Sequence, residues 1–277
     1  MLKKGTMNKV KVTAIIALIV LAFSNARAFA FGITVDGKLD EWGVTPDVHG
    51  SSSHWTPNAG IYMSEEDTPP SQDRVWPGYG GQKFDVEGMY ITSDDMNLYY
   101  AIVTGFPSGG ANGYPYFPGD IGFDFGTIAY YEYAIPVVNR NGFTQGTLYQ
   151  VPSNGWKKGL WGTGNPYGYH DDLSDPAYIL NGTATATQGG NLIYTDHWHE
   201  GNQTVSYNGN HWVIEGYMPW EAFGSNRWQN IRMHWTMSCA NDYLNVDMPA
   251  HTPEPGSIAL LGLGLVGIVR KLFKRSV

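Results

Sequence analysis

The sequence predicts an all-β protein, a two-sheet antiparallel sandwich of jelly-roll or Greek-key type. Apolar segments between residues 31 and 250 are short and are bounded by turn-forming residues, and long helical periodicity is rare. Residues 212–217 alternate between two unlike faces, which is the period of a half-buried strand. Short strands without β-α-β alternation indicate a sandwich.

Ten strands are expected from this pattern. In chain order they are Ile33–Val35, Val86–Thr92, Leu98–Thr104, Asp120–Phe125, Tyr130–Pro136, Thr147–Val151, Leu192–Thr195, His211–Met218, Ile231–Cys239 and Tyr243–Met248. Ser93–Asn97 reads as a hairpin turn, and Trp220–Phe223 as a helical turn. Two long irregular regions, Thr45–Lys83 and Asn154–Gly190, interrupt the strands, and loops of that length are often functional.

Charge and cysteine content narrow the class of partner. Segment 31–250 holds 8 basic and 24 acidic residues, a formal net charge of −16. Nucleic acid is therefore not expected as a partner, because binding phosphates requires clustered cations. Cys239 is the single cysteine, so an internal disulfide is impossible, and we expect it to be buried as a small apolar residue.

The N-terminus has the order of a secretory signal peptide. Four lysines precede the apolar stretch Val12–Phe23, and small residues follow up to Ala30. We predict a signal helix in residues 1–30 with cleavage after Ala28 or Ala30. The alternative, a first transmembrane helix, is disfavoured because the apolar stretch is short.

The C-terminus, residues 251–277, has three parts in order. They are the tripeptide Pro253, Glu254, Pro255, the apolar run Ser257–Val269, and a basic cluster that includes Arg270 and Lys271. The run is shorter than the roughly 20 residues of a membrane span, yet flanking cations can anchor it transiently as a membrane helix. The alternative is an ordinary tail anchor.

This C-terminal pattern resembles the PEP-CTERM sorting signal. The resemblance implies a Gram-negative bacterium, transient anchoring in the inner membrane and cleavage by exosortase. It also implies delivery to the cell surface or the extracellular polysaccharide matrix of a biofilm.

The sandwich segment, residues 31–250, opens with a strand-like stretch, an Asp36-Gly37 turn and an acid followed by Trp42. This resembles the entry motif of the DOMON-like superfamily, which includes the family 9 carbohydrate-binding modules. The resemblance implies a β-sandwich that binds sugars and, in those modules, calcium. Without it, Asp36-Gly37 reads as a tight turn and Trp42 as a core residue.

Exposed aromatic rings can stack on sugar rings, and the two long irregular regions are rich in them. The candidate ligand-binding residues are Trp55, Trp76, Tyr79, Trp156, Trp161 and Tyr167. Core packing is the alternative for each. Trp42, Trp212, Trp220 and Trp235 lie in or beside strands and are expected in the core.

Metal ligands are not assigned by the sequence. Structural Ca²⁺ is the favoured cofactor, since carboxylates such as Asp36, Asp40, Glu41, Asp171, Asp172 and Asp175 are hard oxygen donors. A transition-metal site at His197, His199 and Glu200 is a weaker alternative, because a pair of histidines two residues apart lacks a defined further ligand.

The sequence is interpreted as that of a non-catalytic, exported protein that binds exopolysaccharide or another glycan. Two alternatives remain: a secreted enzyme acting on polysaccharide, and a structural surface protein without a small ligand. Glycoside hydrolysis requires two carboxylates about 5 to 10 Å apart, and Asp120 and Asp124 share a strand face at a backbone separation of about 13 Å.

Overall fold

The computed structural model describes residues 32–44, 55–66, 81–111, 113–126, 130–159, 176–195, 211–250 and 264. The predicted signal helix lies outside these residues, and so does the predicted C-terminal membrane helix apart from Gly264. None of the described helices combines the length and apolar character that a membrane crossing requires. Phe31–His251 form one compact unit, and it is this unit whose fold follows.

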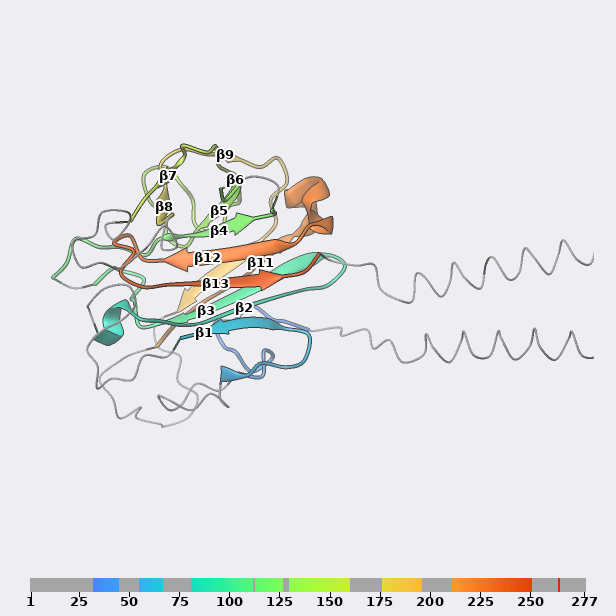
Figure 1. Ribbon diagram of the computed structural model, residues 1–277, viewed down its shortest axis with the longest axis horizontal. Helices are drawn as coiled ribbons and strands as arrows, with labels where there is room; N and C mark the ends of the chain where they lie inside the picture. The colour runs from blue at the N-terminus through green and yellow to red at the C-terminus, as the bar shows by residue number, and fades with distance from the viewer. Residues whose placement is uncertain are drawn as a thin grey trace, which may run out of the picture. The chain divides into compact units, whose positions relative to one another are not determined.

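Two antiparallel sheets make up the unit (Figure 1). One has the strand order β1-β2-β3-β11-β10, with β1 at Tyr62–Glu65, β2 at Val86–Ser93, β3 at Asn97–Thr104, β11 at Trp212–Pro219 and β10 at Asn191–Thr195. The other has the order β13-β12-β4-β5-β6-β9, with β13 at Tyr243–Met248, β12 at Ile231–Thr236, β4 at Asp120–Asp124, β5 at Tyr133–Pro136, β6 at Tyr149–Gln150 and β9 at Thr183–Ala184. A short ribbon pairs β7, Trp156–Lys157, with β8, Tyr178–Ile179.

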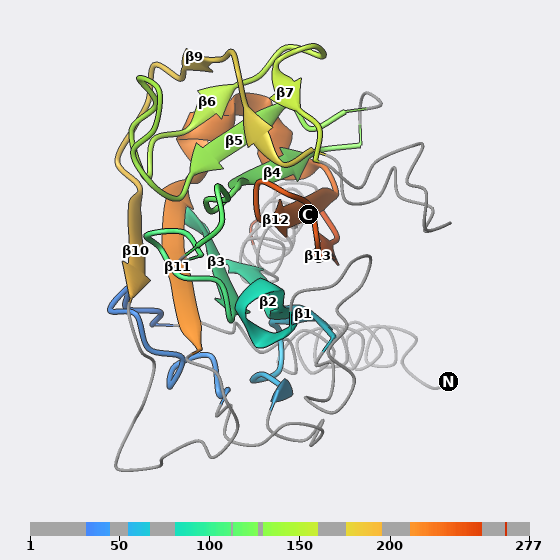
Figure 2. The same ribbon diagram turned by 90° about the vertical axis from the view of Figure 1, so that its left-hand side faces the viewer.

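The core lies between the two sheets, which Figure 2 shows as separate layers. Alternate residues of the long strands face it, as Leu98, Tyr100 and Ile102 do in β3. Ile121 and Phe123 of β4 face it from the other sheet. A sheet with one face in the core requires this period of two, so the predicted all-β, antiparallel fold is confirmed. The finer jelly-roll or Greek-key assignment stays a prediction.

The long strands were predicted well and the short ones poorly. The prediction of a strand at Ile33–Val35 is wrong, because that segment carries no backbone ladder. The strand predicted to reach Cys239 ends at Thr236, and Cys239 lies in the following turn, where it is buried as expected. The regions predicted as irregular contain β1, β7, β8 and β9, each of two to four residues.

The predicted hairpin and helical turn are both confirmed, and they contact each other. In the hairpin, Asp94 Oδ1 accepts the backbone N–H groups of Met96 and Asn97, each at 2.7 Å. The helical turn belongs to a 3₁₀ segment, η3, at Trp220–Trp228, which follows Pro219 and is broken at Gly224. The Trp220 indole N–H donates to the Asp94 carbonyl at 3.0 Å, so the turn is pinned to the hairpin.

The outer face of the five-stranded sheet is covered by the segment that precedes it in the chain. Glu215 of β11 is fully buried there and accepts three hydrogen bonds from this segment. Its Oε2 accepts the N–H groups of Asp36 at 3.0 Å and Gly37 at 2.8 Å, and its Oε1 accepts the Trp42 indole N–H at 2.9 Å. Gly37 has φ +83°, as the predicted Asp-Gly turn requires. Trp42 is confirmed as a core residue.

We expect Glu215→Ala to lower the free energy of unfolding by about 3 kcal/mol, since it leaves the buried N–H groups of Gly37 and Trp42 and the part-buried N–H of Asp36 without an acceptor. For a domain of this size that is a fall in Tm of about 6 to 12 °C. Glu215→Gln keeps one acceptor oxygen, so its Tm should lie between those of the wild-type protein and Glu215→Ala. Thermal unfolding followed by circular dichroism measures both, with Glu221→Gln, an exposed residue of η3, as the control. Equal Tm values for all three variants would contradict a stabilising role for the three hydrogen bonds that Glu215 accepts.

Candidate functional site

The outer face of the six-stranded sheet carries polar side chains at one end. Arg232 of β12 stands directly opposite Asp247 of β13 and Asp124 of β4, so three charged residues share one row across three strands. Arg232 is bidentate to Asp247, with Nε to Oδ1 at 2.7 Å and Nη2 to Oδ2 at 2.9 Å. The guanidinium holds the pKa of Asp247 below its usual range. Both side chains remain open to solvent, at 48% and 64% exposed.

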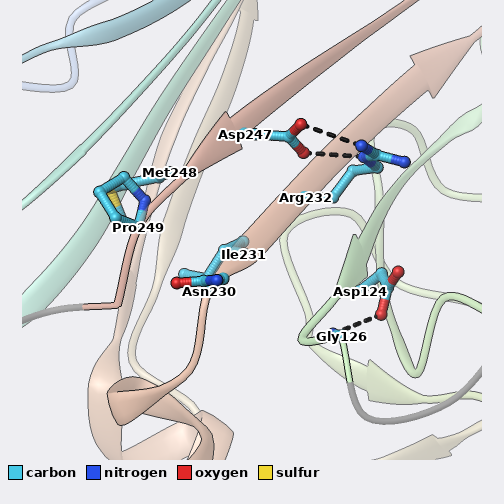
Figure 3. A pocket seen from close by; sticks show the side chains of 8 residues that line it. All are labelled: Asp124, Gly126, Asn230, Ile231, Arg232, Asp247, Met248 and Pro249. Carbon is cyan, nitrogen blue, oxygen red and sulfur yellow. Dashed lines mark hydrogen bonds and ion pairs between the residues drawn. The ribbon is translucent and has the colours of Figure 1, made fainter.

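This row borders a groove with a volume of about 500 Å³. Figure 3 shows the Arg232 and Asp247 pair on one side, with Asp124 close by from the neighbouring strand. The groove is lined by Asp124, Gly126, Asn230, Ile231, Arg232, Asp247, Met248 and Pro249. Asp124 is held in place because its Oδ1 accepts the Gly126 N–H at 2.6 Å. Carboxylates, a guanidinium and an amide thus supply hydrogen-bond acceptors and donors around one open space.

Farther along the same face the sheet is covered by buried groups. His234 of β12 is fully buried, and its Nε2 donates to the Pro176 carbonyl at 3.0 Å. The side-chain amide of Asn245 lies 2.8 Å from His234 Nδ1 and 3.2 Å from the Tyr131 hydroxyl. Burial lowers the pKa of His234 to about 4, so the imidazole is neutral at pH 7. This cluster closes the face, and the groove is the part that stays open.

Asp120 lies on the same face as Asp124, but the structure gives the two residues different roles. Asp120 is fully buried, and its Oδ2 accepts the Ile179 N–H at 2.8 Å and pairs with Arg140 at 2.5 Å. The Arg140 guanidinium also lies over the rings of Phe117 and Tyr178. Only Asp124 of the two lines the groove. The pair is thus split between a buried ion pair and a surface site, and does not form one two-carboxylate centre.

The predicted ligand-binding aromatics have different outcomes. Trp55 was expected to present an exposed ring, and that expectation is wrong. The residue is 3% exposed, its ring packs over Gly88, and its carbonyl accepts the Tyr90 hydroxyl at 3.0 Å. Trp156 is half-buried, and its indole N–H donates to the Tyr131 carbonyl at 2.8 Å. Trp220 and Trp235 are buried as predicted, whereas Trp212 is only partly buried. Outside the described residues lie Trp76, Tyr79, Trp161 and Tyr167.

A carboxylate cluster forms at the opposite end of β12 and β13. Glu66, Asp85 and Asp242 each bring a carboxylate oxygen within 4.8 Å of the others. Asp85 and Asp242 are buried, and Asp242 accepts the backbone N–H groups of Val86 at 2.5 Å and Tyr243 at 2.8 Å. Burial, and then the charge of Glu66, raise the pKa of Asp242 well above its usual range. Three such groups can be accommodated by a shared proton or by a bound cation.

The donor set fits the calcium that the resemblance to family 9 modules implies. Ca²⁺ takes six to eight oxygen ligands, and three carboxylates suit it. Asn241, next to Asp242 in the chain, is 1% exposed, and neither its side-chain oxygen nor its nitrogen has a hydrogen-bond partner in the described part of the chain. Sequence reasoning missed this set, which joins residues up to 176 positions apart. Of the donors named from sequence, Asp36, Asp40 and Glu41 lie elsewhere, and the other candidates fall outside the described residues: Asp171, Asp172, Asp175, His197, His199 and Glu200.

The comparisons identify the C-terminus. Residues 251–275 match the model of the PEP-CTERM protein-sorting motif. The chain carries a PEP-CTERM sorting signal. The predicted signal residues Pro253, Glu254, Pro255, Arg270 and Lys271 all fall within the match, so the predicted motif is confirmed, and the role of each residue stays a prediction. A comparison with curated proteins finds no match.

The PEP-CTERM signal defines the route of the protein. It indicates export, processing by exosortase at the membrane and placement at the surface. The matched stretch covers 25 of 277 residues, so the function of the sandwich has to be inferred from its own geometry.

The buried His234 gives a pH dependence. A base whose pKa falls from 6.5 to about 4 on folding binds fewer protons in the folded state, so stability is lost as the pH falls through that window. We expect His234→Gln to lower the free energy of unfolding less at pH 4.5 than at pH 7. The difference should be about 2 kcal/mol, since one pH unit corresponds to 1.36 kcal/mol. Urea unfolding of both proteins at both pH values gives this difference. An equal loss of stability at the two pH values would show that His234 is not the source of the pH dependence.

Proposed function

We propose that the protein is a non-catalytic surface or matrix protein that binds exopolysaccharide or another glycan in the groove beside Arg232. The observation that carries this proposal is the row of Asp124, Arg232 and Asp247, which presents fixed donors and acceptors to an open space. Vicinal sugar hydroxyls donate and accept at once, so they match alternating carboxylates and cations. The bidentate pair orients both side chains before any ligand arrives, which lowers the entropic cost of binding.

Three further observations support the proposal. The sorting signal directs the protein to the surface, where extracellular polysaccharide is the abundant ligand. The Asp36-Gly37 and Trp42 motif resembles the opening of the DOMON-like superfamily with its family 9 carbohydrate-binding modules. The acidic sandwich segment disfavours nucleic acid and other polyanions as competing ligands.

The groove is tested by affinity electrophoresis of the exported, processed protein in gels containing the exopolysaccharide of the producing cells. We expect the wild-type protein to be retarded and Arg232→Ala to bind at least tenfold more weakly, a loss of about 1.4 kcal/mol. Arg227→Ala is the matched control, because Arg227 is bonded to the Asp95 carbonyl and lies outside the groove. Unchanged mobility of the wild-type protein would favour a structural role.

The same samples test the enzymatic alternative. Two carboxylates, Asp124 and Asp247, line the groove. The lowered pKa of Asp247 makes it a poor general acid near neutral pH. We expect no new reducing ends after prolonged incubation with the polysaccharide. Their release, abolished by Asp124→Asn, would replace the binding proposal with a hydrolase.

Structural Ca²⁺ at Glu66, Asp85 and Asp242 is the second part of the proposal. Calcium at a hundredfold excess over its Kd would stabilise the fold by about 2.7 kcal/mol. We expect CaCl₂ to raise the Tm of the chelator-treated protein and of Glu65→Gln, its exposed neighbour, but not of Glu66→Gln. A shared proton gives a different result: no response to calcium, and a higher Tm for Glu66→Gln because a like charge is removed.

A further inference from the structure

The segment between β3 and β4, which does not line the groove, carries an exposed tyrosine and a half-buried one. Tyr114 is 57% exposed, one of the most exposed large hydrophobic side chains in the described part of the chain. The ring of Tyr116 is nearly parallel to it, with an interplanar angle of 12° and ring centroids 6.1 Å apart. We call Tyr114 and Tyr116 together the tyrosine platform.

The tyrosine platform has a buried support. Phe84, which is 4% exposed, meets Tyr114 edge to face at 5.4 Å and 89°, and Tyr116 at 6.0 Å and 79°. Phe84 in turn meets Phe106 of the core at 5.5 Å. Edge-to-face contacts on both rings fix their orientation, because each is held by the same buried side chain. Tyr116 additionally packs against the main core.

The backbone beneath the platform is also fixed. Phe117 donates its N–H to Ser238 Oγ at 3.0 Å, and Ser238 donates its N–H to the Phe117 carbonyl at 2.9 Å. Gly110, at φ +84°, allows a close approach, since a Cβ there would lie 2.6 Å from the Tyr116 carbonyl oxygen. The rings are therefore held in place in the absence of a ligand, and binding would cost little ordering entropy.

We infer that the tyrosine platform is a second carbohydrate subsite, one that takes the flat C–H faces of a neutral hexose chain. The exposed ring of Tyr114, with the half-buried ring of Tyr116 parallel to it, offers apolar surface on which a sugar ring whose hydroxyls are equatorial can pack. Such sugars present C–H groups on both faces, and these pack on aromatic faces. The net charge of −16 over residues 31–250 disfavours anionic polysaccharides and favours neutral ones.

The subsite is separate from the groove, although it shares the premise of the proposed function that the exported domain meets polysaccharide. The platform segment leads into Asp120, the first residue of β4, whereas the groove contains Asp124, the last. Ser238 follows the end of β12, whereas the groove contains Ile231 at its start. The two sites are therefore at opposite ends of the strands they share, and separate variants can test them.

The test is affinity electrophoresis of the exported, processed protein in hydroxyethyl cellulose, a neutral β-1,4-linked glucan, with polygalacturonate as the anionic comparison. We expect retardation in the first gel only. Tyr114→Ala should weaken it at least tenfold, and Tyr114→Phe should stay within twofold because the ring is kept. Tyr62→Ala, at a tyrosine 40% exposed on β1, is the matched control and should bind as wild type.

The outcomes separate this inference from the groove proposal. Loss in Tyr114→Ala with normal binding in Arg232→Ala supports the platform as an independent subsite. Wild-type binding by Tyr114→Ala, equal losses in Tyr114→Ala and Tyr62→Ala, or no retardation of the wild-type protein in hydroxyethyl cellulose overturns it. These results with hydroxyethyl cellulose leave the groove proposal open, because that proposal is tested with Arg232→Ala and the exopolysaccharide of the producing cells. Because Tyr114 is exposed, unchanged thermal unfolding of its variants shows that a loss is not a folding defect.

Discussion

The fold depends on one buried carboxylate, that of Glu215, which holds the first described segment of the sandwich against the five-stranded sheet. Two backbone N–H groups and one indole N–H converge on it. Burial raises the pKa of Glu215 to about 7, and these three donors work against that rise. The bonds place Trp42 beside Tyr90, with ring centroids 6.3 Å apart, in a second apolar cluster on the outer face of the sheet. This cluster covers that part of the outer face.

The groove lies on the outer face of the other, six-stranded sheet. Most of the outer face of the six-stranded sheet is also occupied, by the buried Asp120 and Arg140 pair at one end and by His234 with its amide and carbonyl partners in the middle. These contacts supply hydrogen-bond partners for Asp120 Oδ2 and for both ring nitrogens of His234, whereas Asp120 Oδ1 and Arg140 Nε and Nη1 are buried without one in the described part of the chain. The groove at Arg232 begins where this cover stops, so its position follows from what the neighbouring loops bury.

The sequence predicted features that are encoded locally and missed those assembled across the chain. Long strands such as β3 and β11 are buried along most of their eight residues, and apolar-rich runs of that length bounded by turn residues are visible in the sequence. Strands of two residues, such as β7 and β9, have no period to detect. Trp55 was expected to be exposed because it stands in an irregular region, but Gly88 leaves space for its ring on the sheet. Burial of a loop aromatic is decided by a distant residue.

The candidate sites follow the same rule. Asp124 was singled out as an acid, but its groove partners Arg232 and Asp247 come from strands more than 100 residues later, joined to it by strand register alone. The sorting signal was found because all of its parts lie within 25 residues.

The groove and the sorting signal meet in the chain. Pro249 is the last residue lining the groove, and the matched motif begins two positions later, at His251. The groove residues and the sorting signal are thus separated in the sequence by Ala250 alone, so cleavage within the signal leaves every residue that lines the groove on the sandwich.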